Sequence, residues 1–309
     1  PYASPPVGDL RFAAPIPPES WEGVRETKRF SPASPQLPGE GLTDRFPVRW
    51  DEDCLYLNVS APVEALEAND SSDRAVMVWI HGGGYTSGQG AIPWYNGNRF
   101  AKNNDIVVVS INYRLGALGF ADLTHLGEEF ATSNINGTLD QIAALKWVQD
   151  NIAAFGGDPS RVTIAGESAG GFSVATLMAC PSAEGLFQQA IPQSGACHHT
   201  LPQEASKKVT EHFLGELGLN SAVELEAASA EDILAAQKTT TAHFAQGAGQ
   251  VNSLGVAVSP FYPVHGNTTL PEDPLTAARN GASDTVRVLT GSNKDETTLW
   301  SVGETDQEK

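Results

Sequence analysis

The sequence predicts an α/β fold with a mostly parallel central sheet, and three observations predict it. Residues 75–80 and 106–112 are apolar runs with the length of buried strands. Residues 161–165 have the same character. Between the second and third runs, apolar residues recur at three- and four-residue spacing, as in an amphipathic helix: Leu139, Ile142, Leu145, Val148 and Ile152. A strand, a helix and another buried strand in succession form a right-handed crossover in a parallel sheet.

Composition narrows the class of protein and its partners. The chain has 309 residues, enough for a substantial core in one or two domains, and 40% of them are hydrophobic, as in a soluble globular protein. The net charge of −18 argues against nucleic-acid or anionic-membrane partners. The longest apolar runs are too short to span a bilayer. An oligomeric state is not indicated.

The three cysteines give the only sequence signal about compartment. Cys54, Cys180 and Cys197 stand far apart and cannot all pair within the chain, which favours a reducing, cytoplasmic location. Because the chain starts at Pro1 without an initiator Met, its targeting is not judged from this end.

The strongest chemical signal lies in residues 155–171. A helical pattern ends at Gly156, residues 158–159 are expected to form a turn, and a short strand leads into the sequence Gly-Glu-Ser-Ala-Gly at 166–170. This fits a nucleophile elbow, in which a strained turn from strand to helix exposes a serine at the carboxyl end of the sheet. Ser168 is therefore predicted to be a nucleophile.

A second glycine-rich segment, His-Gly-Gly-Gly at 81–84, ends the first predicted strand. A phosphate-binding loop is an alternative, but no Lys-Ser/Thr pair follows and no helix start is evident. A plain turn is the other alternative. Paired with a later Gly-x-Ser-x-Gly, the segment instead predicts an oxyanion loop, whose backbone N–H groups stabilise a developing negative charge. His81 is predicted to pack the loop.

Several segments resemble the type-B carboxylesterases, the cholinesterase-like branch of the α/β-hydrolases. Residues 1–12 look like an early segment of that family, residues 52–59 resemble its second signature, and residues 113–120 match a further block. The resemblance covers nearly the entire chain. It implies an α/β-hydrolase fold, with the mostly parallel sheet flanked by helices, and oxyanion donors at Gly83, Gly84 and Ala169.

The resemblance also implies structural roles for charged residues and a cysteine. Arg11 and Glu52 would form an ion pair, and Arg114 would pair with Asp158 to brace the elbow. Many members pair the cysteine at position 54 with one before a Pro-Gln. Here Ser34 stands at that place, so Cys54 is expected to be a free thiol.

A serine nucleophile needs a base and an orienting acid, which follow in the order acid, then histidine, in α/β-hydrolases. Glu296 follows the predicted strand 286–290 in an Asn-Lys-Asp-Glu context that matches the family's acidic member, with Asp295 as its neighbouring competitor. All seven histidines precede Glu296. We therefore expect residues 1–309 to form a single partial catalytic domain, truncated at both ends, without the early strands and the triad histidine.

The remaining segments are expected to support the fold. A short strand is predicted at 190–193, and residues 203–245 predict two or three peripheral helices. A metal site at His198 and His199 is not favoured, since adjacent residues point different ways; the resemblance places this segment near the acyl side of the substrate pocket. His265, in a turn where the family has Asp, is interpreted as structural.

The function predicted is a serine-dependent carboxylic ester hydrolase acting through an acyl-enzyme on a small-molecule ester, with no metal or organic cofactor. A choline preference is unsupported. Two alternatives remain: a non-catalytic adhesion or scaffold protein of the same fold, and an acyltransferase that uses an alcohol in place of water. Labelling by a fluorophosphonate separates the first alternative from the hydrolase, and product analysis separates the second.

Overall fold

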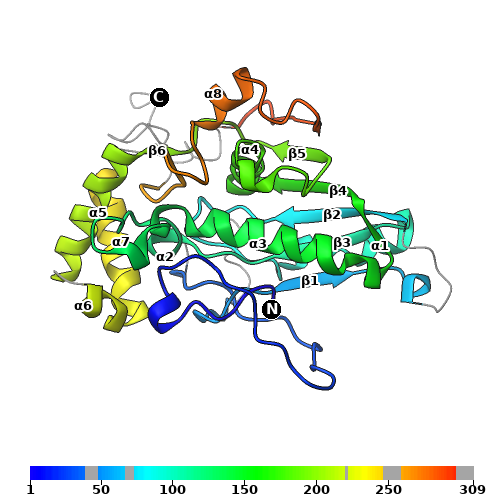
Figure 1. Ribbon diagram of the computed structural model, residues 1–309, viewed down its shortest axis with the longest axis horizontal. Coiled ribbons are helices and arrows are strands. Elements are labelled where there is room, and N and C mark those ends of the chain that lie inside the picture. The colour runs from blue at the N-terminus through cyan, green and yellow to red at the C-terminus, as the bar shows by residue number, and fades with distance from the viewer. Residues whose placement is uncertain (39–47, 67–72, 220–221, 246–258, 297–309) are drawn as a thin grey trace.

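The computed structural model describes residues 1–38, 48–66, 73–219, 222–245 and 259–296. Within these residues, six strands form the main sheet in the order β1-β3-β2-β4-β5-β8 (Figure 1). β1 is antiparallel to β3, and every other neighbouring pair is parallel, which confirms the predicted sheet type. The strands are β1 (Leu57–Ser60), β2 (Arg74–Ile80), β3 (Val107–Ile111), β4 (Gly157–Glu167), β5 (Gln189–Gln193) and β8 (Arg287–Val288).

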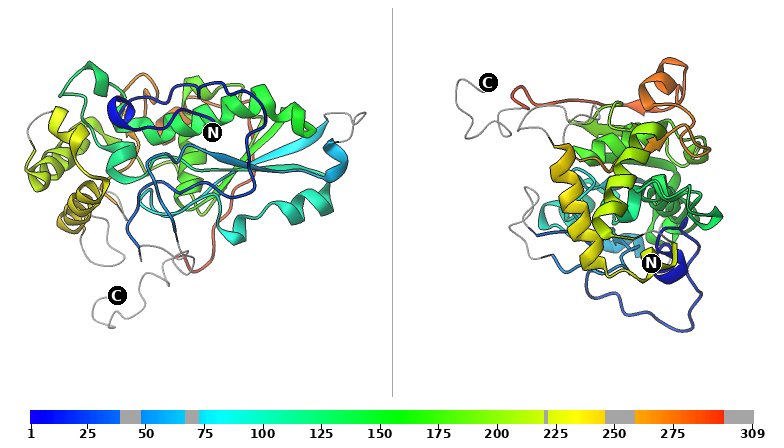
Figure 2. Two further views of the ribbon diagram at one scale, coloured as in Figure 1. Left: turned by 90° about the horizontal axis from the view of Figure 1, so that it is seen from below. Right: turned by 90° about the vertical axis from the view of Figure 1, so that its left-hand side faces the viewer.

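Helices cover both faces of this sheet. α3 (Asn136–Asn151) and α4 (Ala169–Met178) lie on one face, and α1 (Asn98–Asn104) lies on the other (Figure 2). α8 (Pro274–Arg279) packs on α4. Of the helices that the structure describes, none has the length and apolarity to cross a lipid bilayer.

A further group of helices lies beyond the carboxyl ends of the parallel strands, at the left of Figure 1. It includes three helices within the segment 203–245, in agreement with the prediction there. A small parallel pair, β6 (Leu201–Pro202) with β7 (Val264–His265), joins this region to the sheet. The helices of the group are α2 (Gly116–Phe120), α5 (Gln203–Leu217), α6 (Ala222–Ala227) and α7 (Ala230–Phe244).

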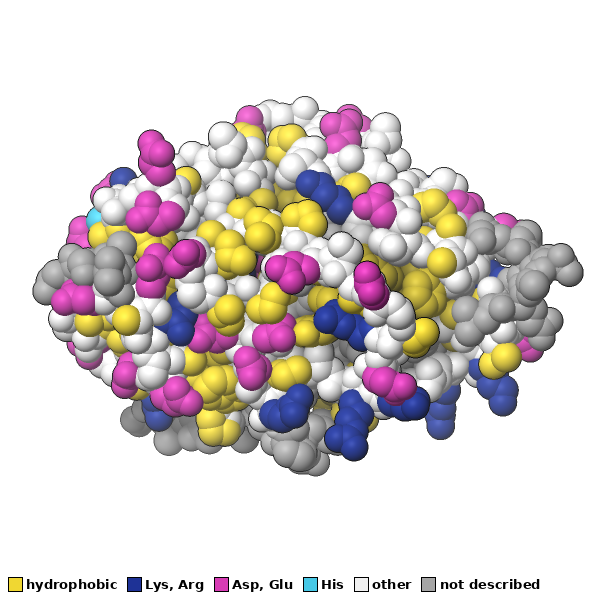
Figure 3. Space-filling model, turned by 60° about the horizontal axis from the view of Figure 1, so that its bottom comes forward, with side chains coloured by type: hydrophobic (Ala, Val, Ile, Leu, Met, Phe, Trp, Pro, Cys, Tyr) yellow, Lys and Arg dark blue, Asp and Glu magenta, His cyan; other side chains and the backbone are white. Residues whose placement is uncertain are grey.

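The burial of each strand follows from its place in the sheet. β3 is buried at every position because it has a strand on each side and helices over its faces. In β2, Val76, Val78 and Ile80 are buried on one face, while Met77 and Trp79 are half-buried on the other. On the face of the molecule in Figure 3, acidic and basic side chains lie among apolar ones. The net charge of −18 is therefore not expressed there as a continuous acidic surface.

Two strand predictions differ from the structure. β4 is longer than the predicted 161–165, and the expected turn at 158–159 lies inside it. An irregular register opposite Arg74 accommodates this turn, in which the Asp158 carboxylate accepts a 2.8 Å hydrogen bond from the Ser160 N–H. β8 is shorter than the predicted 286–290, although Gly291 continues toward β5 through a bridge to Gln193.

The expected pairing of Arg114 with Asp158 is wrong. Arg114 follows the carboxyl end of β3, whereas Asp158 lies at the amino end of the parallel strand β4, so the two are at opposite ends of the sheet. Arg114 instead binds Asp140 of α3, with Nε–Oδ2 and Nη2–Oδ1 distances of 2.8 and 2.7 Å. Both side chains are almost completely buried. The brace thus joins the end of β3 to the helix that precedes the elbow.

Other structural expectations are confirmed. Arg11 and Glu52 form an ion pair at 2.6 Å, and Arg11 also donates to the carbonyl of Ala228. Cys54 is a buried free thiol. Its pKa is raised well above the ordinary value, mainly by burial, so it stays protonated at neutral pH.

Asp140→Asn is expected to destabilise the protein by about 3–5 kcal/mol, because it leaves the buried Arg114 guanidinium without a counter-charge. The measurement is the free energy of unfolding from urea denaturation. Glu204→Gln is the matched control, since it removes a surface ion pair with Lys208 and should cost less than about 1 kcal/mol. Equal losses in the two variants would contradict the assigned brace.

Candidate active site

Ser168 lies between the end of β4 and the first residue of α4. Its backbone has φ 56° and ψ −123°, a conformation that a non-glycine residue rarely adopts. Backbone hydrogen bonds hold it there: the Ser168 N–H donates to the carbonyl of Gln193 at 3.0 Å, and the Ser168 carbonyl accepts from the N–H of Phe172 at 2.8 Å. The predicted strained turn from strand to helix is present.

Glycines on either side of Ser168 are required by close backbone contacts. A methyl group at Gly166 would lie 2.5 Å from the carbonyl carbon of Gly170. A methyl group at Gly170 would lie 2.1 Å from the carbonyl oxygen of Ile80 at the end of β2. Neither position has room for a side chain, so these glycines let β4, α4 and β2 meet directly behind the serine.

The glycine-rich segment after β2 lies against Ser168. A methyl group at Gly82 would be 3.3 Å from the Ser168 Cβ. Gly83, Gly84 and Tyr85 have φ values of 112°, 60° and 62°, so three consecutive residues are left-handed or nearly so. The structure therefore brings the two predicted glycine motifs together at the carboxyl end of the sheet.

The loop's carbonyl and N–H groups are used differently. The carbonyl of Gly83 accepts hydrogen bonds from the N–H groups of Thr86 and Ser87, each at 3.0 Å. The N–H groups of Gly83 and Gly84, by contrast, donate to no other residue that the structure describes. Ala169 is the first residue of α4, where helix N–H groups have no intrahelical acceptor. Among the described residues, the three predicted N–H groups are thus available to donate hydrogen bonds to a negatively charged oxygen.

His81, the first residue of the glycine-rich segment, packs against Tyr113. It is buried and stacks on the Tyr113 ring at 4.5 Å, and the Tyr113 hydroxyl donates to its carbonyl at 2.9 Å. Burial lowers the pKa of His81 to about 4, so the ring is neutral at pH 7. These contacts agree with the predicted packing role.

Glu296 lies in the turn after β8. Its Oε1 accepts a hydrogen bond from the N–H of Asn293 at 2.6 Å. A hydrogen bond from the Ser194 side chain, and then that N–H, lower its pKa, so the carboxylate is charged at neutral pH. Ser194 follows Gln193, the residue whose carbonyl holds the N–H of Ser168. Asp295 is exposed, and the residues after 296 lie outside the described part of the chain.

Glu167, which has no role in the sequence-based predictions, immediately precedes Ser168 and is close enough to Glu296 to be affected by its charge. A methyl group at Gly82 would be 3.3 Å from its Oε2. Burial, and secondly the charge of Glu296, raise the pKa of the half-buried Glu167. The signal was present in the motif itself, since Glu167 immediately precedes the serine.

None of the seven histidines, all of which are described, hydrogen-bonds to the Ser168 hydroxyl. His265 bonds instead to the Thr200 hydroxyl at 3.0 Å. His212 and His243 stack on each other at 4.0 Å, on α5 and α7. Within the described residues, no three His, Cys, Asp or Glu side chains are grouped so that they could hold a metal ion.

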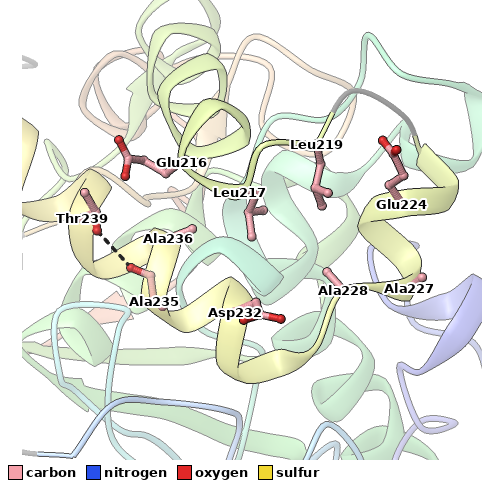
Figure 4. Close-up of a pocket in the computed structure, with 10 residues that line it drawn as sticks. All are labelled: Glu216, Leu217, Leu219, Glu224, Ala227, Ala228, Asp232, Ala235, Ala236 and Thr239. Carbon is pink, nitrogen blue, oxygen red and sulfur yellow. Dashed lines mark hydrogen bonds between the residues drawn. The ribbon is translucent and has the colours of Figure 1, made fainter.

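A cavity of about 490 Å³ lies away from the elbow, between α5, α6 and α7 (Figure 4). Its walls include Leu217, Leu219 and Ala236, with Glu224 and Asp232 nearby. Ser168, Gly83, Gly84 and Glu296 do not line it. The cavity is therefore separate from the predicted catalytic and oxyanion residues.

The carboxylesterase family model matches residues 1–309. The chain belongs to the carboxylesterase family. Para-nitrobenzyl esterase of Bacillus subtilis (strain 168) is 42% identical over 310 residues, which cover 99% of this chain and 60% of that protein. Phenmedipham hydrolase of Pseudarthrobacter oxydans is 38% identical, with 97% of this chain and 57% of that protein covered.

Solved structures of carboxylesterases give the same assignment of fold. A thermophilic PNB esterase superposes with a TM-score of 0.89 at 41% identity, covering 99% of this chain and 61% of its own. A carboxylesterase of Geobacillus stearothermophilus superposes with a TM-score of 0.84 at 40% identity, and the match covers 98% of this chain and 58% of that carboxylesterase. The fold is that of an α/β-hydrolase. The chain spans about 60% of the length of the curated relatives named here.

In the full-length protein, Gly83→Ala is expected to keep the fold and to lower the kcat of the predicted ester hydrolysis by about 10² to 10³, because moving one N–H out of the oxyanion site has the effect of losing that donor. The added methyl group would lie 2.2 Å from the carbonyl oxygen of Ser87, so the loop must move. Steady-state kinetics on a short activated ester measure the change.

Gly185→Ala is the matched control for Gly83→Ala. Gly185 also has a positive φ, 79°, but nothing lies within 4 Å of an added methyl group there. It should show backbone strain without a fall in kcat. A folded Gly83→Ala enzyme with normal kcat would remove Gly83 from the oxyanion site.

Proposed function

We propose that residues 1–309 belong to a single catalytic domain of a serine-dependent carboxylic ester hydrolase that acts through an acyl-enzyme. The observation that carries the proposal is the strained Ser168 backbone beside the glycine-rich loop, in which the N–H groups of Gly83 and Gly84 donate to no other residue that the structure describes. A nucleophile beside preorganised donors suits attack on a carbonyl carbon. The names of the relatives, para-nitrobenzyl esterase among them, support the same reaction class.

In the proposed reaction, the Ser168 hydroxyl oxygen bonds to the carbonyl carbon of a small-molecule ester. The carbonyl oxygen becomes negatively charged and accepts hydrogen bonds from the N–H groups of Gly83, Gly84 and Ala169. The bond to the alkoxy group then breaks, the alcohol leaves with a proton, and an acyl-serine remains. Water attacks the acyl-serine, which releases the acid and restores the hydroxyl. No step requires a metal or an organic cofactor.

We place the general base on a histidine outside residues 1–309, oriented by Glu296. The proposal is supported by the seven histidines in the chain, none of which hydrogen-bonds to the Ser168 hydroxyl. The charged state of Glu296 suits the orienting role, because an ionised carboxylate stabilises the imidazolium that forms when the histidine takes the serine proton. Glu167, with its raised pKa, suits that role less well.

A fluorophosphonate probe tests the proposal on the full-length protein. The activated serine oxygen displaces fluoride from phosphorus, so peptide mass spectrometry should find the probe on Ser168 and on no other serine. Denatured protein and the Ser168→Ala variant are the controls, and neither should be labelled. A native protein that resists the probe, as a non-catalytic adhesion protein would, contradicts the proposal.

A further inference from the structure

The carboxyl end of the glycine-rich loop is held by α2. Tyr85 directly follows Gly84, and its carbonyl accepts a 2.7 Å hydrogen bond from the N–H of Gly116, the first residue of α2. The Tyr85 ring is buried and packs edge-on against Phe120, the last residue of that helix, with 5.1 Å between the ring centroids. The backbone and the side chain of Tyr85 therefore both depend on where α2 lies.

Gln237 binds the first turn of α2 from the neighbouring helix α7. Its Oε1 accepts a 2.9 Å hydrogen bond from the N–H of Ala117. The N–H groups in the first turn of a helix have no acceptor within the helix, so Gln237 supplies one that the helix backbone does not. Ala117 is completely buried and Gln237 is 3% exposed, so water has little access to this hydrogen bond.

The close approach of Gln237 to α2 depends on Gly116. A methyl group at Gly116 would lie 1.9 Å from the Oε1 and 2.5 Å from the Cδ of Gln237, so the amide occupies the space that a side chain there would need. Gly116 also has a φ of 54°, a conformation that glycine adopts at no steric cost. The residue that donates to the Tyr85 carbonyl is therefore the residue against which the Gln237 amide packs.

The two residues that precede Gly116 are held by other parts of the chain. The N–H of Arg114 donates to the Asp140 carboxylate at 3.0 Å, and the N–H of Leu115 donates to the Ser34 hydroxyl at 3.2 Å. These hydrogen bonds keep the segment leading into α2 in place whatever happens at α7. Loss of the hydrogen bond from α7 should therefore shift the first turn of α2 without releasing the whole segment.

We propose that Gln237 is a positioning residue for the oxyanion donors of the glycine-rich loop. Its hydrogen bond with Ala117 fixes the first turn of α2. The hydrogen bond from Gly116 to Tyr85 then carries that position to the N–H of Gly84. This inference rests on the proposed function, in which the Gly84 N–H donates to the oxyanion. Gln237 acts through α2 and takes no part in the making or breaking of bonds.

Loss of this hydrogen bond should lower kcat and leave KM almost unchanged. Without the Gln237 oxygen, the buried Ala117 N–H has no acceptor, so the present position of α2 is less favourable. The oxyanion forms only in the transition state, and a displaced donor therefore weakens transition-state stabilisation more than binding of the uncharged ester. Complete loss of a donor costs about 10² to 10³ in kcat, and a displaced donor should cost less, on the order of tenfold.

Kinetics of the full-length protein with p-nitrophenyl acetate test the proposal through Gln237→Met. Methionine is also unbranched and has a similar volume, but it has no oxygen to accept from Ala117. We expect kcat to fall on the order of tenfold, with KM changed by less than about twofold. Gln237→Asn keeps the amide but withdraws its oxygen by one methylene group. It should show the same fall in kcat, and it replaces Gln237→Met if that variant does not fold.

Thr240→Val is the matched control. Thr240 is also buried on α7, and its hydroxyl is hydrogen-bonded at 3.3 Å to the Nδ1 of His212 on α5. Valine has nearly the shape of threonine, so this variant removes a buried hydrogen bond between α7 and α5 and leaves the one to α2. Its kcat should equal that of the wild type. A normal kcat in the Gln237 variants, or an equal fall in Thr240→Val, overturns the proposal.

A second measurement does not depend on catalysis. Amide NMR spectra of the full-length protein labelled with ¹⁵N-glycine report on Gly84 and Gly116. The Gly84 signal decides, because Gly116 contacts Gln237 directly whereas Gly84 is linked to it through Tyr85. It should shift in Gln237→Met and stay in place in Thr240→Val. An unchanged Gly84 signal in Gln237→Met overturns the proposal. A shifted signal in a protein that hydrolyses no ester upholds the positioning of the loop while contradicting the hydrolase.

Discussion

Ser168→Ala is expected to lower the turnover of a short activated ester by on the order of 10⁶, the effect of removing a triad nucleophile. The alanine keeps the backbone conformation and leaves the Gly83 and Gly84 N–H groups in place. Only the attacking oxygen is lost. The remaining rate should therefore reflect substrate binding and the oxyanion donors alone, roughly 10³ over water. Steady-state kinetics with a burst-phase measurement check both the rate and the loss of the acyl-enzyme.

Ser160→Ala is the matched control for the nucleophile. Ser160 is an exposed serine on β4, the strand that ends at Ser168, and its hydroxyl donates to Asp158. Its removal should leave turnover unchanged and stability within about 0.5 kcal/mol. If Ser168→Ala kept a tenth of the wild-type rate, Ser168 would not be the nucleophile.

The sequence was sufficient to predict the strained elbow at Ser168 and the glycine-rich loop that lies against it, because backbone sterics act locally. Gly166 and Gly170 have no room for a Cβ, and Gly83 has a positive φ, so the glycine spacing reflects the geometry that surrounds Ser168. The strands could also be predicted from the sequence, since continuous apolar runs are typical of strands buried on both faces of a sheet. β2 and β3 were predicted within one or two residues of their observed ends.

Pairings between side chains far apart in the sequence were harder to predict. The partner of Arg114 was assigned by resemblance, but strand direction places Asp158 at the far end of the sheet. The stack of Phe172 on His199 depends on a loop that returns to α4, and no periodicity in the sequence encodes that return. Periodic patterns report which face of an element is buried, whereas these contacts depend on which elements meet.

The second large effect is expected at Glu296. Glu296→Gln should lower kcat/KM by roughly 10³ to 10⁴, because a neutral amide cannot stabilise the imidazolium formed when the base takes the Ser168 proton. The fold should survive, since the amide oxygen of the glutamine can still accept the hydrogen bond from the Asn293 N–H. Asp295→Asn is the matched control, being the exposed neighbour with the same charge. A loss in Asp295→Asn with normal activity in Glu296→Gln would reverse the choice between them.

A titration gives a test of the Glu296 position that does not depend on turnover. The pKa of Glu167 is raised first by burial and secondly by the negative charge of Glu296. Glu296→Gln removes that like charge, so the pKa of Glu167 should fall, while burial still holds it above the ordinary range. Asp295→Asn should leave it closer to the wild-type value, because burial and the charge of Glu296 are the causes of the shift. Carbon-detected NMR of the Glu167 carboxyl measures each pKa. An unchanged Glu167 pKa in Glu296→Gln would show that the two carboxylates do not face each other, and Glu296 would then be too far from the Ser168 site to orient its base.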